Sequence, residues 1–75
     1  MQNNKFNYPD FAARLKALRK AKGLSQKQLA LLAKIPLYMI ITCESAKPYH
    51  GLENLVKLAD FFNMRINTLL LGVDS

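Results

Sequence analysis

Side chains that could do covalent or metal chemistry are few in this 75-residue chain. Cys43 is its only cysteine, so no internal disulfide can form, and His50 is its only histidine. A metal site needs several Cys, His or carboxylate ligands at suitable spacing, and a catalytic thiol needs a base beside it. The sequence shows neither arrangement. We therefore expect no enzyme activity, no metal and no cofactor, with Cys43 a small buried apolar side chain and His50 a solvated loop residue.

Basic side chains, by contrast, are abundant and concentrated in the first half of the chain. Residues 1–34 hold eight Lys or Arg against Asp10, a balance of +7, and residues 35–75 hold three against four acids, a balance of −1, which together give the net +6. A basic domain of this size attracts polyanions, double-stranded DNA first. The same charges also suit an ordinary solvated surface, so charge alone does not decide the partner.

The elements that must carry these side chains are predicted to be helices. After Asp10, a plausible N-cap, Phe11, Leu15 and Leu18 follow helical spacing, with Ala12 beside them. A second apolar stripe comprises Leu52, Leu55, Val56, Ala59 and Phe62. The predicted fold class is all-α, with helices over about 10–22, 26–34, 37–45, 52–62 and 66–71. One domain would span 10–72, between a flexible arm at 1–9 and a tail at 73–75.

The centre of the chain predicts a helix-turn-helix. Gly23 ends one helix, Leu24 returns to the core, and Ser25 can cap the next helix through its hydroxyl. A break near Lys34 and Pro36 follows before another short helix begins. Two short helices joined by a three- or four-residue turn form this motif, and its second helix is the one presented to a partner.

Residues 11–71 resemble the Cro/repressor helix-turn-helix family, or XRE type. The motifs that carry the resemblance are Leu15, Leu18-Arg19, Lys22-Gly23-Leu24-Ser25-Gln26, Leu29-Ala30, Ile40 followed by Glu44, and Leu55 followed by Leu58 to Met64. The resemblance implies a five-helix lambda-repressor-like domain, usually a homodimer, with its third helix in the DNA major groove. It also implies a phosphate contact from Gln26 and a buried ion pair between Arg19 and Glu44.

Three positions depart from the family pattern. Lys34 replaces the usual turn glycine, and a lysine in the left-handed region costs about 1–2 kcal/mol. Pro36 replaces the usual Ser or Thr at the start of the third helix and removes a capping hydroxyl. Arg65 stands where a capping Ser is common. These departures lie in the turn, at the start of the third helix and at the start of the last helix.

The third helix does not choose clearly between DNA and protein. Its predicted outward residues are Leu37, Tyr38, Ile41 and Thr42, with Met39 at their edge, and only Tyr38 and Thr42 can form hydrogen bonds with bases. In one interpretation this regulator gains affinity from phosphates through Gln26, Lys27, Lys34 and Lys47. In another, Leu37, Tyr38 and Ile41 dock a protein, as in a phage antirepressor or modulator of a repressor. In a third, the helix is rotated and these side chains are core.

The end of the chain also has two interpretations. Leu69, Leu70, Leu71 and Val73 could close the core, or they could form a homodimer interface. Neither a signal peptide nor an apolar run long enough to cross a membrane is evident. We therefore expect a soluble protein in the cytoplasm of a prokaryotic cell or phage-infected host.

Overall fold

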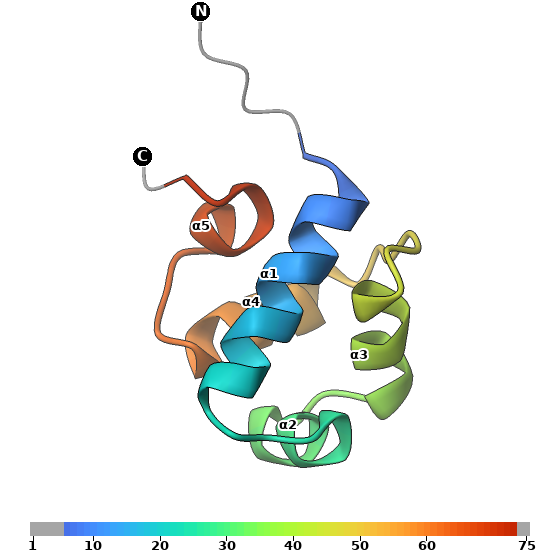
Figure 1. Cartoon of the computed structure of the whole chain (residues 1–75), viewed down its shortest axis with the longest axis vertical. Coiled ribbons are helices and arrows are strands. Elements are labelled where there is room, and N and C mark those ends of the chain that lie inside the picture. The colour runs from blue at the N-terminus through green and yellow to red at the C-terminus, as the bar shows by residue number, and fades with distance from the viewer. Residues whose placement is uncertain (1–5, 74–75) are drawn as a thin grey trace, which may run out of the picture.

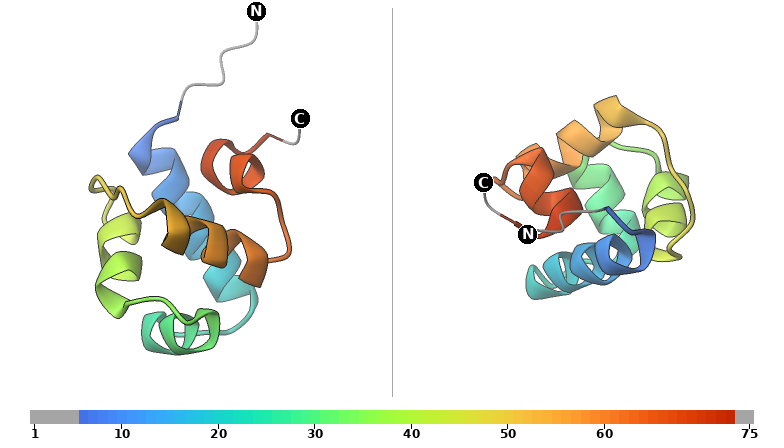
Figure 2. Two further views of the ribbon diagram at one scale, coloured as in Figure 1. Left: turned by 180° about the vertical axis from the view of Figure 1, so that it is seen from behind. Right: turned by 90° about the horizontal axis from the view of Figure 1, so that it is seen from above.

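The computed structural model describes residues 6–73, and within this range the chain forms five helices and no strand. The helices are α1 (Tyr8–Ala21), α2 (Gln26–Ala33), α3 (Leu37–Glu44), α4 (Leu52–Phe61) and α5 (Ile66–Leu71). The predicted all-α class and the order of its five helices are confirmed. Helix α1 runs through the middle of the domain, with α3 on one side and α5 on the other (Figure 1). Seen from above, α1 and α4 lie opposite each other, with α3 and α5 at the sides (Figure 2).

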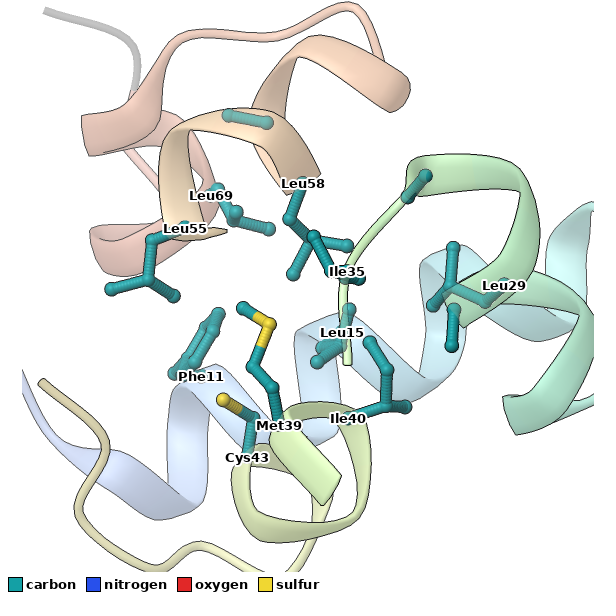
Figure 3. Packing of buried hydrophobic residues seen from close by; sticks show 13 residues of the cluster. Phe11, Leu15, Leu29, Ile35, Met39, Ile40, Cys43, Leu55, Leu58 and Leu69 are labelled. Carbon is teal, nitrogen blue, oxygen red and sulfur yellow. The ribbon is translucent and has the colours of Figure 1, made fainter. Parts of the chain in front are cut away.

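One apolar core joins all five helices. Its buried members are Phe11, Leu15, Leu29, Ala30, Ala33, Ile35, Met39, Ile40, Cys43, Leu55, Leu58, Ala59 and Leu69. Figure 3 shows how the labelled side chains converge, with Ile35 entering from the segment between α2 and α3. Helix α3 places Met39, Ile40 and Cys43 in this core, so an eight-residue helix that would be marginal in isolation is stabilised by packing against the others.

Helix α1 begins two residues earlier than predicted. Asn7 is its N-cap, and the Asn7 side-chain oxygen accepts a hydrogen bond from the Asp10 N–H at 2.7 Å. Asp10 lies inside the first turn and pairs with Arg14 one turn later. The prediction of an arm over residues 1–9 was therefore wrong for Tyr8 and Pro9, because an asparagine oxygen caps as well as an aspartate. Residues 1–5 and 74–75, the rest of the predicted arm and tail, lie outside the described residues.

The helices that were predicted to end at Lys22, Lys34, Ser45 and Phe62 each end one residue earlier, and these four residues are the C-caps. In α4 the predicted inward stripe was correct for Leu55 and Ala59 but wrong for Leu52, which is 64% exposed. Val56 is exposed as well, and Leu58 is buried in their place. The buried face of α4 is thus the narrow i, i+3, i+4 set centred on Leu58, while Leu52 lies in a first turn that extends past the core.

Candidate nucleic-acid interface

The start of α2 is fixed by a reciprocal pair of hydrogen bonds. The Gln28 N–H donates to the Ser25 hydroxyl at 3.0 Å, and the Ser25 N–H donates to the Gln28 side-chain oxygen at 2.8 Å. This capping box satisfies two of the backbone donors that a helix leaves free at its start. Gly23 supplies the left-handed turn before it, at φ +69°. The sequence motif therefore sets both the position and the direction of α2.

The turn between α2 and α3 keeps the left-handed residue in spite of its lysine. Lys34 has φ 62° and ψ 46°, and its N–H donates to the Ala30 carbonyl. The Ile35 N–H donates to the same carbonyl at 3.0 Å. Pro36 then serves as the N-cap of α3 and provides no side-chain hydrogen bond. Burial of Ile35 in the core accounts for the persistence of a turn that costs backbone strain at Lys34.

A buried ion pair holds α3 against α1. The Arg19 guanidinium donates to both oxygens of Glu44, from Nε at 2.7 Å and from Nη2 at 2.9 Å. Arg19 Nη1 also donates to the Leu24 carbonyl at 2.8 Å, which ties the pair to the loop before α2. The hydrogen bond to Glu44 raises the pKa of Arg19 above its ordinary value, against the opposing effect of burial. The pair implied by the family resemblance is therefore present and links α1, α3 and the loop.

Gln26 joins the same network. Its side-chain Nε2 donates to Glu44 Oε1 at 3.1 Å, and the residue is half-buried. The resemblance placed a phosphate contact at this position. An amide group has two N–H bonds, so one can stay on Glu44 while the other faces outward. The hydrogen bond to the buried Glu44 thus fixes the orientation of the Gln26 side chain.

The outer face of α3 is exposed and almost uncharged. Tyr38 is 63% exposed and Ile41 is 45% exposed, while Leu37 and Thr42 are half-buried. These exposures exclude the rotated-helix interpretation for Tyr38 and Ile41. Met39 was predicted at the edge of this face, and that was wrong. It is fully buried, because α3 turns its Met39 side into the core beside Cys43 (Figure 3).

The Tyr38 ring has a neighbour that sequence reasoning missed. The Tyr49 ring lies 6.3 Å from it between centroids, and Asn54 on α4 donates to the Tyr49 hydroxyl at 2.8 Å. Burial raises the pKa of Tyr49. A side chain at Gly51 would collide with the Tyr49 ring. The spacing of Tyr49, Gly51 and Asn54 was the available signal, since a glycine two residues after an aromatic can let the ring fold back over the chain.

Positive charge surrounds the motif rather than lying on α3. Lys27, Lys34 and Lys47 are all exposed, the first on α2, the second in the turn and the third after α3. The sequence has no acidic residue from 11 to 43, and Glu44 is neutralised by Arg19. The helix-turn-helix therefore has a positive margin around an apolar centre, and Asp60 on α4 lines a hollow beside Lys34.

The leucines at the end of the chain belong partly to the core and partly to the surface. Leu69 is fully buried in the core, so the prediction that it lines a homodimer interface was wrong. Its carbonyl accepts a hydrogen bond from Arg14 Nη1 at 3.3 Å, which joins α5 to α1. Leu70 and Leu71 are half-buried and remain open to a partner on one side. Val73 is half-buried as well, so the predicted interface loses Leu69 and keeps Leu70, Leu71 and Val73.

In residues 6–73 the metal-ligating side chains are scattered and the one thiol is buried. Within that range no three His, Cys, Asp or Glu side chains are grouped closely enough to hold a metal ion. Burial raises the pKa of the Cys43 thiol to about 11, so it is protonated and poorly nucleophilic at neutral pH. Across the same described part of the chain, no helix has the length and apolar character needed to span a membrane.

The chain is similar to known regulators of transcription. No protein-family model matches it. The HTH-type transcriptional activator BcrR of Enterococcus faecalis is 36% identical over 63 residues, or 84% of this chain and 31% of that protein, so the chain spans about a third of this relative. The restriction-modification controller protein C.AhdI from Aeromonas hydrophila is 33% identical, with a TM-score of 0.72 over 84% of this chain and 96% of that one. A hypothetical transcription factor, NHTF from Neisseria, shares the fold at 22% identity, with a TM-score of 0.76 over 95% of this chain and 82% of that one.

Proposed function

This chain belongs to the Cro/repressor, or XRE-like, family of helix-turn-helix proteins, and we propose that it regulates transcription by binding double-stranded DNA with α3 in the major groove. The observation that carries the proposal is the Arg19–Glu44 pair, which fixes α3 with Tyr38 and Ile41 facing outward. A helix fixed in this way can enter a groove without reordering, so little conformational entropy is lost on binding.

Phosphates supply most of the binding energy in this proposal. The first N–H groups of α2, at Gln26 and Lys27, have no partner within the helix and suit an anion. The second N–H of the Gln26 amide, which the bond to Glu44 leaves available, would donate to the same anion, and the Lys27 ammonium adds a charge. Lys34 and Lys47 extend the positive margin to either end of α3. Such contacts position the protein on the duplex but do not read its sequence.

Base recognition falls to the exposed side chains of α3. Tyr38 and Thr42 can exchange hydrogen bonds with base edges, whereas Leu37 and Ile41 can only meet thymine methyl groups. The Tyr49 ring, tilted by 58° against the Tyr38 ring and held by a hydrogen bond from Asn54, restricts how far the Tyr38 ring can move. We therefore expect a preferred site that contains thymines opposite Leu37 and Ile41, with one hydrogen-bonded position opposite Tyr38.

Titration of the purified protein with duplex DNA at several salt concentrations tests this function. The affinity should fall steeply with salt, and Lys27→Gln should weaken binding to all sequences while reducing the slope of log K against log salt by about one. Lys57→Gln, a change of the same kind on α4, is the matched control and should change neither quantity. An affinity that does not depend on salt would contradict the proposal.

A second candidate function is protein docking on the outer face of α3. The absence of any positive charge between Lys34 and Lys47 in the sequence favours it, together with the exposure of Tyr38 and Ile41. An antirepressor or modulator of a repressor would bind its partner through Leu37, Tyr38 and Ile41. Burial of apolar surface is barely screened, so such a complex should persist at salt concentrations that release DNA. Its partner would dissociate faster from Ile41→Asp.

We also propose that the regulator forms a two-fold homodimer through Leu70 and Leu71. Both are half-buried on α5, and dimers of this symmetry match the two-fold symmetry of palindromic operators. Sedimentation should show concentration-dependent association that Leu70→Lys weakens without unfolding. Leu52→Lys, at an exposed leucine of α4, should leave the association unchanged. A strictly monomeric protein at high concentration would overturn this interface.

A further inference from the structure

An open apolar groove lies along the outer side of the helix-turn-helix. It has a volume of about 620 Å³ and is lined by Lys27, Ala30, Leu31, Lys34, Ile35 and Leu37. Ala30 and Ile35 form a nearly buried floor at 6% exposure each. Leu31, in contrast, is 78% exposed, the largest value among the exposed large apolar side chains of the described residues. With Ala30, Ile35 and Leu37, Leu31 forms a continuous apolar surface rather than an isolated exposed leucine.

The groove is bordered by positive charge at both ends. Lys27 lies in the first turn of α2 and Lys34 is its C-cap, seven residues later or roughly 10 Å along the helix axis, so they lie near opposite ends of the groove. No acidic residue occurs between positions 11 and 43, and the next one, Glu44, is held by Arg19. Asp60 lies in a separate hollow that Lys34 also lines, together with Lys57. The two rim ammonium groups therefore have no carboxylate within the groove itself.

We propose that this groove binds an acidic amphipathic segment of another protein. One or two apolar side chains of that segment would lie on the Ala30 and Ile35 floor against Leu31. Carboxylates about two helical turns apart would then meet Lys27 and Lys34. Charge complementarity selects this partner, since a neutral apolar segment would leave both ammonium groups unmatched and a basic segment would be repelled.

Occupancy of the groove should compete with DNA. Lys27 and Leu37 line the groove and are also among the proposed DNA contacts, so a bound segment would cover both. This regulatory consequence rests on the proposed DNA-binding function, whereas the groove and its partner chemistry do not. The acidic segment would then release the protein from DNA, and most readily from the sites that the protein binds most weakly.

Selection of a displayed library of random linear peptides on the full chain tests the proposal. The enriched peptides should combine apolar residues with Asp or Glu. Leu31→Gln should weaken their binding by about tenfold, in the range of one hot-spot contact. Lys34→Asn should weaken it severalfold at low salt and less at high salt, because asparagine tolerates the left-handed backbone and removes only the charge. Leu52→Gln changes an equally prominent leucine on α4 and should leave binding unchanged.

Other results would overturn the proposal. These are no enrichment of any peptide, enrichment of neutral or basic peptides, and binding that Leu31→Gln does not weaken. Binding of anionic lipid vesicles without binding of peptides would assign the surface to a membrane instead. Because Leu31 is outside the proposed DNA contacts, Leu31→Gln should keep its affinity for duplex DNA. A protein that binds the peptides but never binds DNA would refute the proposed function and leave the groove assignment intact.

Discussion

The two faces of α3 are made of similar side chains and behave in opposite ways. On the inner face, the side chains of Met39, Ile40 and Cys43 are at most 1% exposed and belong to the core. The outer face, with Tyr38 and Ile41, is 45 to 63% exposed, and the Tyr38 ring lies beside the Tyr49 ring. Apolar character therefore does not decide which face of this helix is inside.

The carboxylate of Glu44, at the end of α3, distinguishes the two faces. Glu44 accepts two hydrogen bonds from Arg19 and one from Gln26, so three hydrogen bonds fix the orientation of its carboxylate. If α3 rotated to bury Ile41, Glu44 would leave Arg19, and both charges would remain buried and unpaired. That cost exceeds what a single isoleucine gains on burial. The ion pair thus specifies which face of α3 points outward as well as contributing to stability.

Removal of the carboxylate should have the largest effect. Glu44→Ala leaves Arg19 buried without its partner, which costs about 3–5 kcal/mol, a large share of the unfolding free energy of so small a domain. Chemical denaturation followed by circular dichroism measures the loss. Glu53→Ala removes an exposed carboxylate from the first turn of α4 and should cost less than about 1 kcal/mol. If the two variants melted alike, the ion pair would not organise the fold.

Neighbouring isoleucines allow a direct comparison of the two faces. Ile40→Ala creates a cavity in the core and should destabilise the domain by about 2–5 kcal/mol. Ile41→Ala removes the same atoms from the exposed face and should change the unfolding free energy by about 0.5 kcal/mol or less. Equal losses would mean that α3 is not oriented as described.

The start of α3 depends on the strained turn before it. Lys34→Gly removes the penalty of a side chain at φ 62° and should stabilise the domain by up to about 1 kcal/mol. Lys27→Gly, within α2, should instead destabilise it by about 1 kcal/mol. The denaturation midpoints of the two variants show whether each change stabilises or destabilises the domain. Destabilisation by Lys34→Gly would show that the lysine side chain contributes more than its backbone strain costs.

Replacement of Cys43, whose thiol lies on the inner face of α3, should give the smallest of these effects on stability. Burial raises the Cys43 pKa to about 11, so between pH 9 and 11 the unfolded chain loses this proton while the folded chain keeps it. The stability contributed by Cys43 is therefore complete below about pH 9 and is lost as the pH rises towards 11. The difference in unfolding free energy between the parent and Cys43→Ala should shrink over this range. A constant difference would contradict burial of the thiol.

Much of this architecture could be predicted from local chemistry. Ser25, Gly23 and Asn63 each favour one backbone conformation or one hydrogen bond, so the ends of the helices follow from the residues themselves. Met39 could not be placed in this way, because a residue near the boundary of two apolar faces is assigned only by the packing of other helices. Tyr49 was missed for a similar reason, since its role depends on Asn54 in the next helix. Long-range contacts, rather than propensity, decide both.

Selection from random-sequence duplex pools at two salt concentrations tests the central claim, that the outer face of α3 reads DNA. The account predicts enrichment of a defined site at low salt, weaker enrichment at high salt, and a thymine preference in the site. Tyr38→Ala should relax the preference at one or two base pairs, at a cost of about 1–3 kcal/mol on the preferred site, while the fold stays intact. Failure to enrich any sequence at either salt concentration, with a folded protein, would contradict the claim.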